Sequence, residues 1–436
     1  MTEEQGLTIA LDAAKAAGAS DAYVDVARTR AVTLRRRHGQ IETSSEATTR
    51  SLSVRVWVEG RYGAATTTDL RPEGLPSFVG HLVALTRELE PDPDRRIADP
   101  GLYPAGERPE LDAGDPAVAG LDAAAREAML ADAASALDAD ADVLSASAEV
   151  RTSEGMVLAA STNGLSSRWA GTQVLVMANA TVHDAGDRRS EDHAWAACRH
   201  LEDLPALAEL GAEAARRAKE RVGSQQGPTR RATMVVEPRA AGTLLRWLIA
   251  GAEGSALHLG RSFWLGRLGE PAVSEVLSLV DDPWLPRGLR SRVHDQEGLA
   301  SAPRAVIEGG ALRSPWLDTT YARKLGMAPT NGGPSNIVVR PGERGLDAIV
   351  GSVEDGVLVT DWVGGNVSES TGDFSVGLRG FALRDGVRGG PVGEMNASGN
   401  LLALFRSLVE VGDDPFQWSP MRSPSLVFEG AQLSGS

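Results

Sequence analysis

The segment DGVLVTDWVGGNVSESTGDFS at residues 355–375, with GEMNASGN at residues 393–400, is the most informative part of the chain. Residues 365–373 are rich in glycine and small polar side chains, which is typical of a tight turn between two strands. A second interpretation is a loop that lines a binding cleft and is ordered by Asp373. The sequence favours neither interpretation over the other. The candidate cleft residues are Asn366, Ser368, Thr371, Asp373, Ser398 and Asn400.

The rest of the C-terminal half has the same pattern of short strands and glycine-rich turns. Residues 232–236 predict a strand and residues 239–250 a helix. Many short strands with few helices favour a closed or barrel-like antiparallel sheet. The segment GSQQGPT at residues 223–229 has the composition of a domain linker. We therefore predict a C-terminal β-rich, barrel-like domain over residues 230–436.

The N-terminal half mixes helical and strand-like segments. It opens with a helix whose capping box pairs Thr2 with Gln5. Residues 91–118 contain six prolines and many acidic groups, which is typical of an extended connector. We predict an N-terminal α+β domain over residues 1–222 with a sandwich-like sheet, so that the whole chain is α+β. The other predicted elements are strands at residues 21–28, 31–37, 51–58, 64–68 and within 143–198, and helices at residues 72–88, 121–137 and 204–222.

Composition narrows the class of protein. The chain has 436 residues, enough for two large domains, and its 42% hydrophobic and 24% charged content is ordinary for a globular protein. Its formal net charge of -15 argues against a nucleic-acid surface, because phosphate binding needs clustered Lys and Arg. The N-terminus lacks the apolar core of a signal peptide, and no apolar run reaches the ~20 residues of a membrane helix. We expect a cytoplasmic protein with neither a nucleic-acid nor a membrane partner.

Residue patterns that bind metals are sparse. Cys198 is the single cysteine, which excludes a disulfide within the chain and a cysteine-based zinc site. A zinc-peptidase helix needs two histidines on one face and a glutamate after the first, and none of the seven histidines is followed by Glu. His193 and His200 flank Cys198, but residues 192–198 alternate like a strand. That alternation favours polar residues on a sheet face over a cluster of metal ligands.

Four further segments of the chain contain motifs that belong with the C-terminal segments at residues 355–375 and 393–400. They are GQIE at residues 39–42, VRVWVEGRYGAATTTDL at 54–70, DQEG at 295–298 and LDTTYARKLG at 317–326. With the C-terminal segments, they resemble the TldD/TldE (PmbA-type) peptidase family, on its TldE/PmbA side. The resemblance spans nearly the whole chain, although residues 91–118 and 180–200 match poorly.

The resemblance implies that the metal site of catalytic family members is missing here. In those relatives a His-Glu-x-x-x-His helix follows the opening of the C-terminal domain, where this chain has LLRWLIAGAEGSALH at residues 244–258. Glu253 and His258 lie five positions apart instead of four, which at ~100° per residue misaligns their side chains. The third family ligand is a thiolate, and its place falls near Ser423. We expect no catalytic residue, no metal and no cofactor on this chain.

The resemblance also implies a partner. TldE-type relatives form a heterodimer with a TldD-type subunit, which holds the zinc and cleaves peptides. We expect an accessory subunit that completes a cleft and helps to select an unstructured peptide or a small amide substrate by strand-like pairing. An obligate pair of this kind buries more than ~2,000 Å². Trp362, beside Gly364 and Gly365, is the candidate interface anchor, and a place in the core is the alternative.

Two other hypotheses stay open. One is a stand-alone hydrolase. Its site would be either around His193, Cys198 and His200 or, without a metal, in the cleft that corresponds to the active site of catalytic relatives. The other is a non-enzymatic homodimer that binds peptides. Activity without a partner that is lost in His193→Ala or His200→Ala favours the first. Peptide affinity in a homodimer, undiminished when the TldD-like protein is absent, favours the second.

Overall fold

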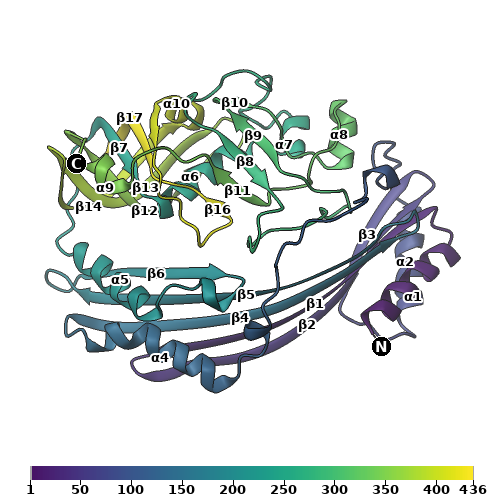
Figure 1. Cartoon of the computed structure of the whole chain (residues 1–436). Coiled ribbons are helices and arrows are strands. Elements are labelled where there is room, and N and C mark those ends of the chain that lie inside the picture. Colours follow the sequence, from purple (N-terminus) through teal and green to yellow (C-terminus); the bar gives the residue numbers. More distant parts are fainter. Residues whose placement is uncertain (1, 436) are drawn as a thin grey trace.

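The computed structural model describes residues 2–435 and shows a long curved sheet together with a β-rich C-terminal unit (Figure 1). The strands of the curved sheet run across the lower half of the view, and the C-terminal unit lies above them. Helices make up 24% and strands 40% of the chain, so strand dominates while both units contain helices. The predicted α+β class is confirmed.

The N-terminal sheet has six antiparallel strands in the order β3-β2-β1-β4-β5-β6. The segments predicted as two strands, at residues 21–28 and 31–37, form one continuous strand because Thr29 and Arg30 between them do not break β structure. A tight turn at His38 and Gly39, both with positive φ, leads into the next strand. The strands are β1 (Asp21–Arg37), β2 (Gln40–Val58), β3 (Arg61–Thr67), β4 (Val143–Ser161), β5 (Ser166–His183) and β6 (Arg189–Cys198).

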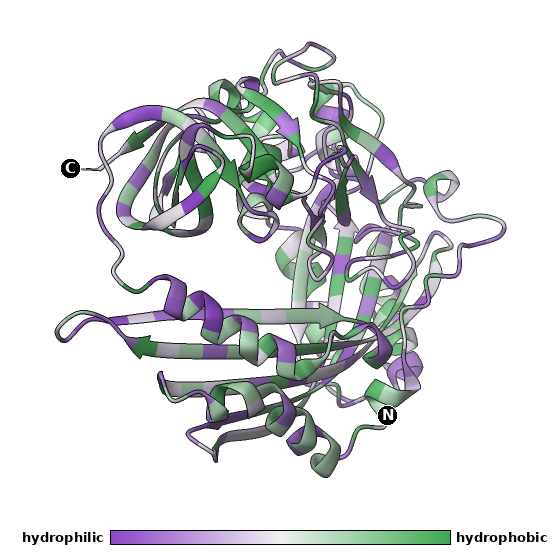
Figure 2. Ribbon diagram, turned by 60° about the vertical axis from the view of Figure 1, so that its left-hand side comes forward, coloured by the Kyte–Doolittle hydropathy of each residue, from purple (hydrophilic) through white to green (hydrophobic). Residues whose placement is uncertain are grey.

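Four helices cover a single face of this sheet. Val24 and Val26 of β1 belong to the apolar core under α1 and α2, whereas Val32 and Leu34 belong to the core under α4 and α5. These four residues are all even-numbered, so they point to the same face of the strand. Figure 2 shows the corresponding alternation of apolar and polar residues along the strands. The helices are α1 (Glu3–Ala16), α2 (Leu75–Thr86), α4 (Ala123–Ala139) and α5 (Leu207–Glu220).

The opposite face of the sheet turns toward the C-terminal unit. Tyr23, Ala159 and Leu165 form a small apolar cluster on it, with Trp57 and Tyr103 packed alongside. The connector at residues 91–118 adjoins this cluster and contains only the short helices η1 (Pro100–Leu102) and α3 (Pro116–Ala119). One face of the sheet is therefore closed by its own helices, and the other is left for the C-terminal unit.

The C-terminal unit contains a closed five-stranded barrel, which confirms the barrel-like prediction. The strands follow the order β14-β13-β12-β7-β17, and a pairing of β14 with β17 closes the ring. Glycine is required where the strands approach closely: a Cβ at Gly380 would lie 1.8 Å from the carbonyl oxygen of Leu358. The strands are β7 (Arg230–Val236), β12 (Asp355–Val367), β13 (Asp373–Arg384), β14 (Val387–Asn400) and β17 (Leu426–Ser434), with β15 (Leu408–Val411) paired to β17.

Successive side chains of a barrel strand point to opposite faces, and each face packs into a different apolar core. Met234 and Val236 of β7 face the main core, where Leu244 and Leu248 of α6 (Pro238–Ala250) are fully buried. Val235 points the other way, into a smaller core covered by α9 (Leu346–Val350). The short helix α10 (Leu401–Arg406) adds Phe405 to the main core.

A second, five-stranded sheet of the C-terminal unit has the order β10-β9-β8-β11-β16. Loops next to this sheet reach the N-terminal sheet, because Arg199 at the end of β6 donates hydrogen bonds to the carbonyls of Gly288 and Leu289 at 2.8 and 2.7 Å. No helix within residues 2–435 is both long and apolar enough to cross a membrane. The remaining elements are α7 (Gly254–His258), β8 (Leu279–Asp282), β9 (Arg304–Glu308), β10 (Ala311–Leu312), α8 (Thr319–Leu325), β11 (Asn336–Val339) and β16 (Met421–Arg422), with η2 (Leu201–Asp203) before α5.

Candidate functional site

The turn at residues 365–373 is held by its own hydrogen bonds. The hydroxyl of Thr371 donates to the Asp373 carboxylate at 2.8 Å, and the backbone N–H of Ser368 donates to the carbonyl of Asp373 at 2.8 Å. The amide nitrogen of Asn400 donates to the carbonyl of Thr371 at 2.8 Å and to the Asp373 carboxylate at 3.0 Å. Hydrogen bonds from Asn400 and Thr371 hold the pKa of Asp373 below its ordinary value.

All six candidate cleft residues lie at this one end of the barrel. Asn400 also caps α10, because its side-chain oxygen accepts from the backbone N–H of Leu402 at 3.1 Å. Asn366 and Ser398 lie on the strands to either side of Ser375, with which both are in register. The bonds observed are those of a well-satisfied turn, and a role in a cleft stays a prediction.

The turn lies beside α7, in the segment where the metal helix of catalytic relatives is expected. A Cβ at Gly372 would come within 3.3 Å of the ring of Phe263. Although Glu253, which precedes α7, is a surface residue, partial desolvation of its carboxyl raises its pKa, and the negative charge of Glu369 in the turn raises it further. Proximity of these two carboxylates places the turn next to residues 244–258.

The side chains at that place do not fit a zinc ion. The helix α6 buries leucines, and Glu253 and His258 are both exposed on the solvent side of the segment. Ser423 is fully buried and its hydroxyl donates to the carbonyl of Pro424 at 3.0 Å. Within residues 2–435, no three His, Cys, Asp or Glu side chains are grouped so that they could hold a metal ion. Zinc needs about four such donors in tetrahedral array.

Trp362 is half-buried against the main core of the C-terminal unit. Its indole nitrogen donates to the carbonyl of Ala240 in α6 at 3.0 Å. Its ring lies 6.1 Å from that of Trp247, measured between centroids. The side chain therefore joins β12 to α6, with one part still open to solvent.

The structure does not bring His193, Cys198 and His200 together as metal ligands. His193 and Cys198 are an odd number of positions apart on β6, so they point to opposite faces of the sheet. Cys198 is buried under α5, where burial raises the pKa of its thiol to about 12. A thiol so far from ionisation is a poor nucleophile. His200 lies beyond the strand, 2.9 Å from the carbonyl oxygen of Asp112.

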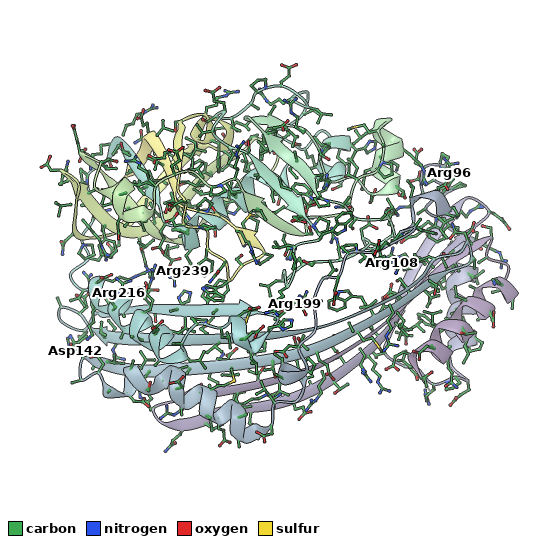
Figure 3. All side chains as sticks on the ribbon, viewed as in Figure 1. Arg96, Arg108, Asp142, Arg199, Arg216 and Arg239 are labelled. Carbon is green, nitrogen blue, oxygen red and sulfur yellow. The ribbon has the colours of Figure 1, made fainter. Side chains whose placement is uncertain are left out.

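A buried cluster of charges joins the two units, and the sequence did not single it out. Asp192 of β6 lies 2.7 Å from Arg221 and 3.6 Å from Arg217, both at the C-terminal end of α5. Arg239 of α6 reaches it from the C-terminal unit at 3.1 Å (Figure 3). Arg217 also pairs with Glu237, which is almost fully buried. The residues next to them in the sequence do not distinguish these buried charged residues from charged residues on the surface.

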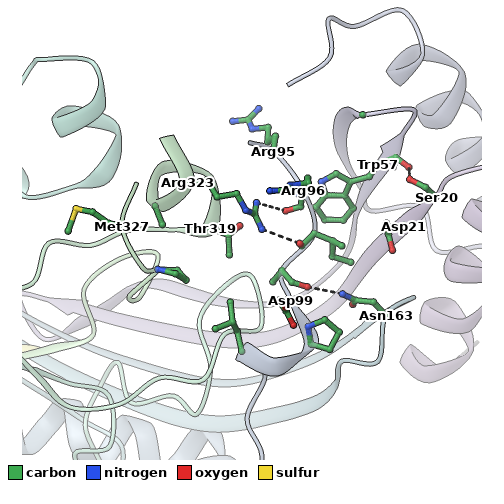
Figure 4. Close-up of a pocket in the computed structure, with 17 residues that line it drawn as sticks. Ser20, Asp21, Trp57, Arg95, Arg96, Asp99, Asn163, Thr319, Arg323 and Met327 are labelled. Atoms are coloured by element: carbon green, nitrogen blue, oxygen red, sulfur yellow. Dashed lines mark hydrogen bonds between the residues drawn. The ribbon is translucent and has the colours of Figure 1, made fainter. Parts of the chain in front are cut away.

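Two larger cavities lie where the units face each other. The first, of about 720 Å³, lies between the exposed face of the N-terminal sheet and the loops at residues 289–296 and 333–334; we call it the interdomain cavity. The second, of about 650 Å³, lies where the connector passes α8 (Figure 4). There Arg323 donates to the carbonyls of Asp94, Arg96 and Ile97 at 2.7, 3.1 and 3.4 Å. The sequence did not predict either cavity, although Asp295 and Gln296 of the DQEG motif line the first.

Comparison with known protein families matches three successive models to the chain. They are the PmbA/TldA metallopeptidase domain 1 at residues 22–85, the central domain at residues 116–222 and the C-terminal domain at residues 229–435. The first two models together contribute all six strands of the single N-terminal sheet. The third covers the barrel and the second sheet.

Individual relatives agree with the family models over almost the full length. The metalloprotease PmbA of Escherichia coli O157:H7 is 29% identical over 99% of this chain and 96% of its own. A solved Bacteroides thetaiotaomicron protein, described as a candidate modulator of DNA gyrase, is 33% identical with a TM-score of 0.95 over 99% of both chains. TldE from Thermococcus kodakarensis, 21% identical, has the same fold with a TM-score of 0.85 over 99% of this chain and 100% of its own. The chain therefore belongs to the PmbA/TldD/TldE family of metallopeptidase-like proteins.

Proposed function

We propose that this chain is a TldE/PmbA-like accessory subunit without a zinc site, and that it pairs with a zinc-bearing TldD-like subunit to form a peptidase or amidase. One observation carries the proposal. In a chain with the family fold over its whole length, residues 244–258 present leucines, a tryptophan and small residues where a metal helix is expected. The buried hydroxyl of Ser423 is bonded to a carbonyl and is no substitute for a thiolate.

The turn at residues 365–373 is our candidate for this chain's share of the substrate cleft. Thr371 and Asp373 are exposed, while the hydrogen bonds between them and from Asn400 hold the turn. A loop ordered in advance loses less entropy when it binds. In the proposal, this turn borders the cavity shared with the partner and helps to select an unstructured peptide or a small amide substrate.

The zinc content of the separate and the paired chains tests the proposal. Expressed alone, the chain should contain no stoichiometric zinc by elemental analysis and should cleave no peptide. Co-expressed with a TldD-like homologue, it should elute with that homologue as a heterodimer and support peptide cleavage. One zinc per chain in the lone protein contradicts the proposal. Cleavage by the lone protein that is lost in His193→Ala or His200→Ala instead supports a stand-alone hydrolase.

Trp362 is our proposed anchor of the partner interface. Trp362→Ala should weaken binding to the TldD-like subunit more than it lowers the chain's own melting temperature, because aromatic residues contribute most to interface energies. Trp362→Phe is the matched variant, which keeps an aromatic ring but loses the bond to Ala240. Normal partner binding by Trp362→Ala, or a failure of that variant to fold, would show that the residue belongs to the core.

A further inference from the structure

The wall of the interdomain cavity is positively charged, in contrast to the chain as a whole. Four arginines and two aspartates line it, a formal net charge of +2, whereas the chain carries -15. Arg55 comes from the N-terminal sheet, and Arg290 and Arg292 come from the loop of the C-terminal unit. Positive charge concentrated in a cleft raises the local concentration of anions.

The floor of the interdomain cavity is rigid. The indole of Trp169 lies along the sheet over Gly155 and Gly171, which pair across β4 and β5 and leave room for it. The guanidinium of Arg199 stacks on this indole at 5.4 Å from its centroid. Arg199 donates one hydrogen bond from each of its three nitrogens, to the carbonyls of Thr172, Gly288 and Leu289, so it fastens the floor to the loop above.

The other three arginines keep donors free. Among the described residues, Arg290 is exposed and its guanidinium has neither a hydrogen bond nor an ion pair. Arg55 stacks on the ring of Tyr23 at 4.7 Å and uses one nitrogen to donate to the carbonyl of Gln296 at 2.8 Å. Arg292 donates to the carbonyl of Gly333, while its buried Nε finds no acceptor within residues 2–435.

The two carboxylates of the wall do not use these donors. Asp295 accepts from the backbone N–H groups of Glu297, Leu299 and Gly332 at 2.9, 3.0 and 3.0 Å, so it is committed to shaping the loop. Burial raises the pKa of Asp25, and the positive charge of Arg55 only partly opposes this. The indole nitrogen of Trp169 is a further buried donor without a partner in the described chain. The wall therefore offers a surplus of donors to a ligand rich in acceptors.

We infer that the interdomain cavity binds the free C-terminal carboxylate of a peptide. Arginine pairs with a carboxylate through two parallel hydrogen bonds, and Arg55, Arg290 and Arg292 surround one space. The rings of Tyr23 and Trp169, with Val157, give the same cavity an apolar side suited to the last side chain of the peptide. A volume of about 720 Å³ holds such a residue and is far larger than an inorganic ion.

This inference deepens the proposed function and rests on it, because it makes peptides with a free C-terminus the substrate or product class. Calorimetric titration of the lone chain tests it with Ala-Ala-Ala-Phe, as the free acid and as the C-terminal amide. The acid should bind at least ~10-fold more tightly than the amide, since only the acid can form charge-assisted hydrogen bonds with the arginines. Equal affinity for the two peptides, or no binding of either, overturns the inference.

Two variants locate the site. Arg290→Gln should lower the affinity for the acid several-fold and leave that for the amide unchanged, and it should fold normally because the side chain is exposed. Arg267→Gln, an equally exposed arginine remote from the cavity wall, should change neither affinity. An acid preference that is undiminished in Arg290→Gln overturns the inference.

Inorganic phosphate separates a peptide site from a general anion site. Phosphate at millimolar concentration should compete weakly with the acid peptide, because it lacks the apolar part. Competition by phosphate as strong as that of the peptide overturns the assignment to peptides. All these titrations use the lone chain, so their outcome is independent of whether it pairs with a zinc-bearing subunit, and the two proposals fail separately.

Discussion

At the scale of single residues, Asn400 joins two elements through one amide. Its oxygen caps α10, and its nitrogen holds the turn at residues 365–373 through Thr371 and Asp373. An asparagine is one of the few side chains with both donors and an acceptor for this geometry. Aspartate would cap the helix equally well but would repel Asp373.

Replacing Asn400 should therefore affect both elements. Asn400→Ala should lower the free energy of unfolding by about 1–2 kcal/mol, the usual cost of losing a helix cap and its neighbouring bonds. Urea denaturation followed by circular dichroism measures the change. The matched control is Asn396→Ala, an exposed asparagine on β14 whose side chain makes no hydrogen bond among the described residues. An equal effect of the two substitutions would show that the cap contributes nothing.

At the scale of secondary-structure elements, Asp192 connects three of them. Its side chain is 2% exposed and lies between Arg217 of α5, Arg221 just after that helix, and Arg239 of α6. Burial opposes its ionisation, but the charges of Arg221, Arg217 and Arg239 together hold its pKa below the ordinary value. The carboxylate is thus the counter-charge that lets α5 and α6 approach each other.

Removing that charge should loosen the junction of the two units. Asp192→Asn leaves three arginines close together with one buried carboxylate, Glu237, among them. Breaking a buried ion pair typically costs about 3–5 kcal/mol, and the melting temperature should fall accordingly. Glu191→Gln, one position away and exposed on the same strand, should leave the melting temperature unchanged. An unchanged melting temperature in Asp192→Asn would contradict a structural role for the cluster.

The lowered pKa of Asp192 also predicts how the stability of the chain depends on pH. Because the pKa of Asp192 is lower in the folded than in the unfolded chain, its contribution is fully present above the ordinary value of 3.8. It is lost as the pH falls through the lower, folded value. The difference in unfolding free energy between the native chain and Asp192→Asn should be constant between about pH 5 and 7 and should shrink below about pH 4. A difference that grows on acidification would contradict the assignment.

At the scale of the whole molecule, polar contacts around the connector help to hold the two units together. The connector has few apolar anchors of its own, and Arg323 of α8 binds its carbonyls at Asp94, Arg96 and Ile97. Lys324 adds an ion pair with Asp92 at 2.8 Å. The C-terminal unit thereby determines the path of a proline-rich segment that belongs to the N-terminal half.

Limited proteolysis tests this dependence. In Arg323→Ala the connector loses the contacts that hold its carbonyls, so trypsin should cut after Arg95 and Arg96 several times faster than in the native chain. Mass spectrometry of the fragments identifies the cleavage sites. Arg313→Ala, which removes an exposed arginine of the same unit, should leave the cutting rate unchanged. Equal rates in the two variants would mean that the connector is held by other contacts.

Alternation and glycine content, which are local properties, were enough to predict much of the fold. Residues 52–58 alternate because one face of β2 is buried, and the prediction of a strand there is correct. The barrel follows from short strands rich in glycine, since only glycine permits the close approach seen at Gly380. The lack of a His-Glu-x-x-x-His helix is likewise a matter of spacing within a few residues.

Tertiary structure alone decided which distant residues meet. Arg55 reaches Gln296 across 241 positions, and Asp192 meets Arg239 across 47. Such pairs depend on the register of long strands and on how the barrel lies against the sheet. Neither the register nor this packing produces a periodic residue pattern that could be recognised in the sequence. The six candidate residues of the barrel end could be picked out from the sequence because they lie in two short segments, the turn at residues 365–373 and the end of β14. The charge cluster and the interdomain cavity were not, because each is assembled from both units.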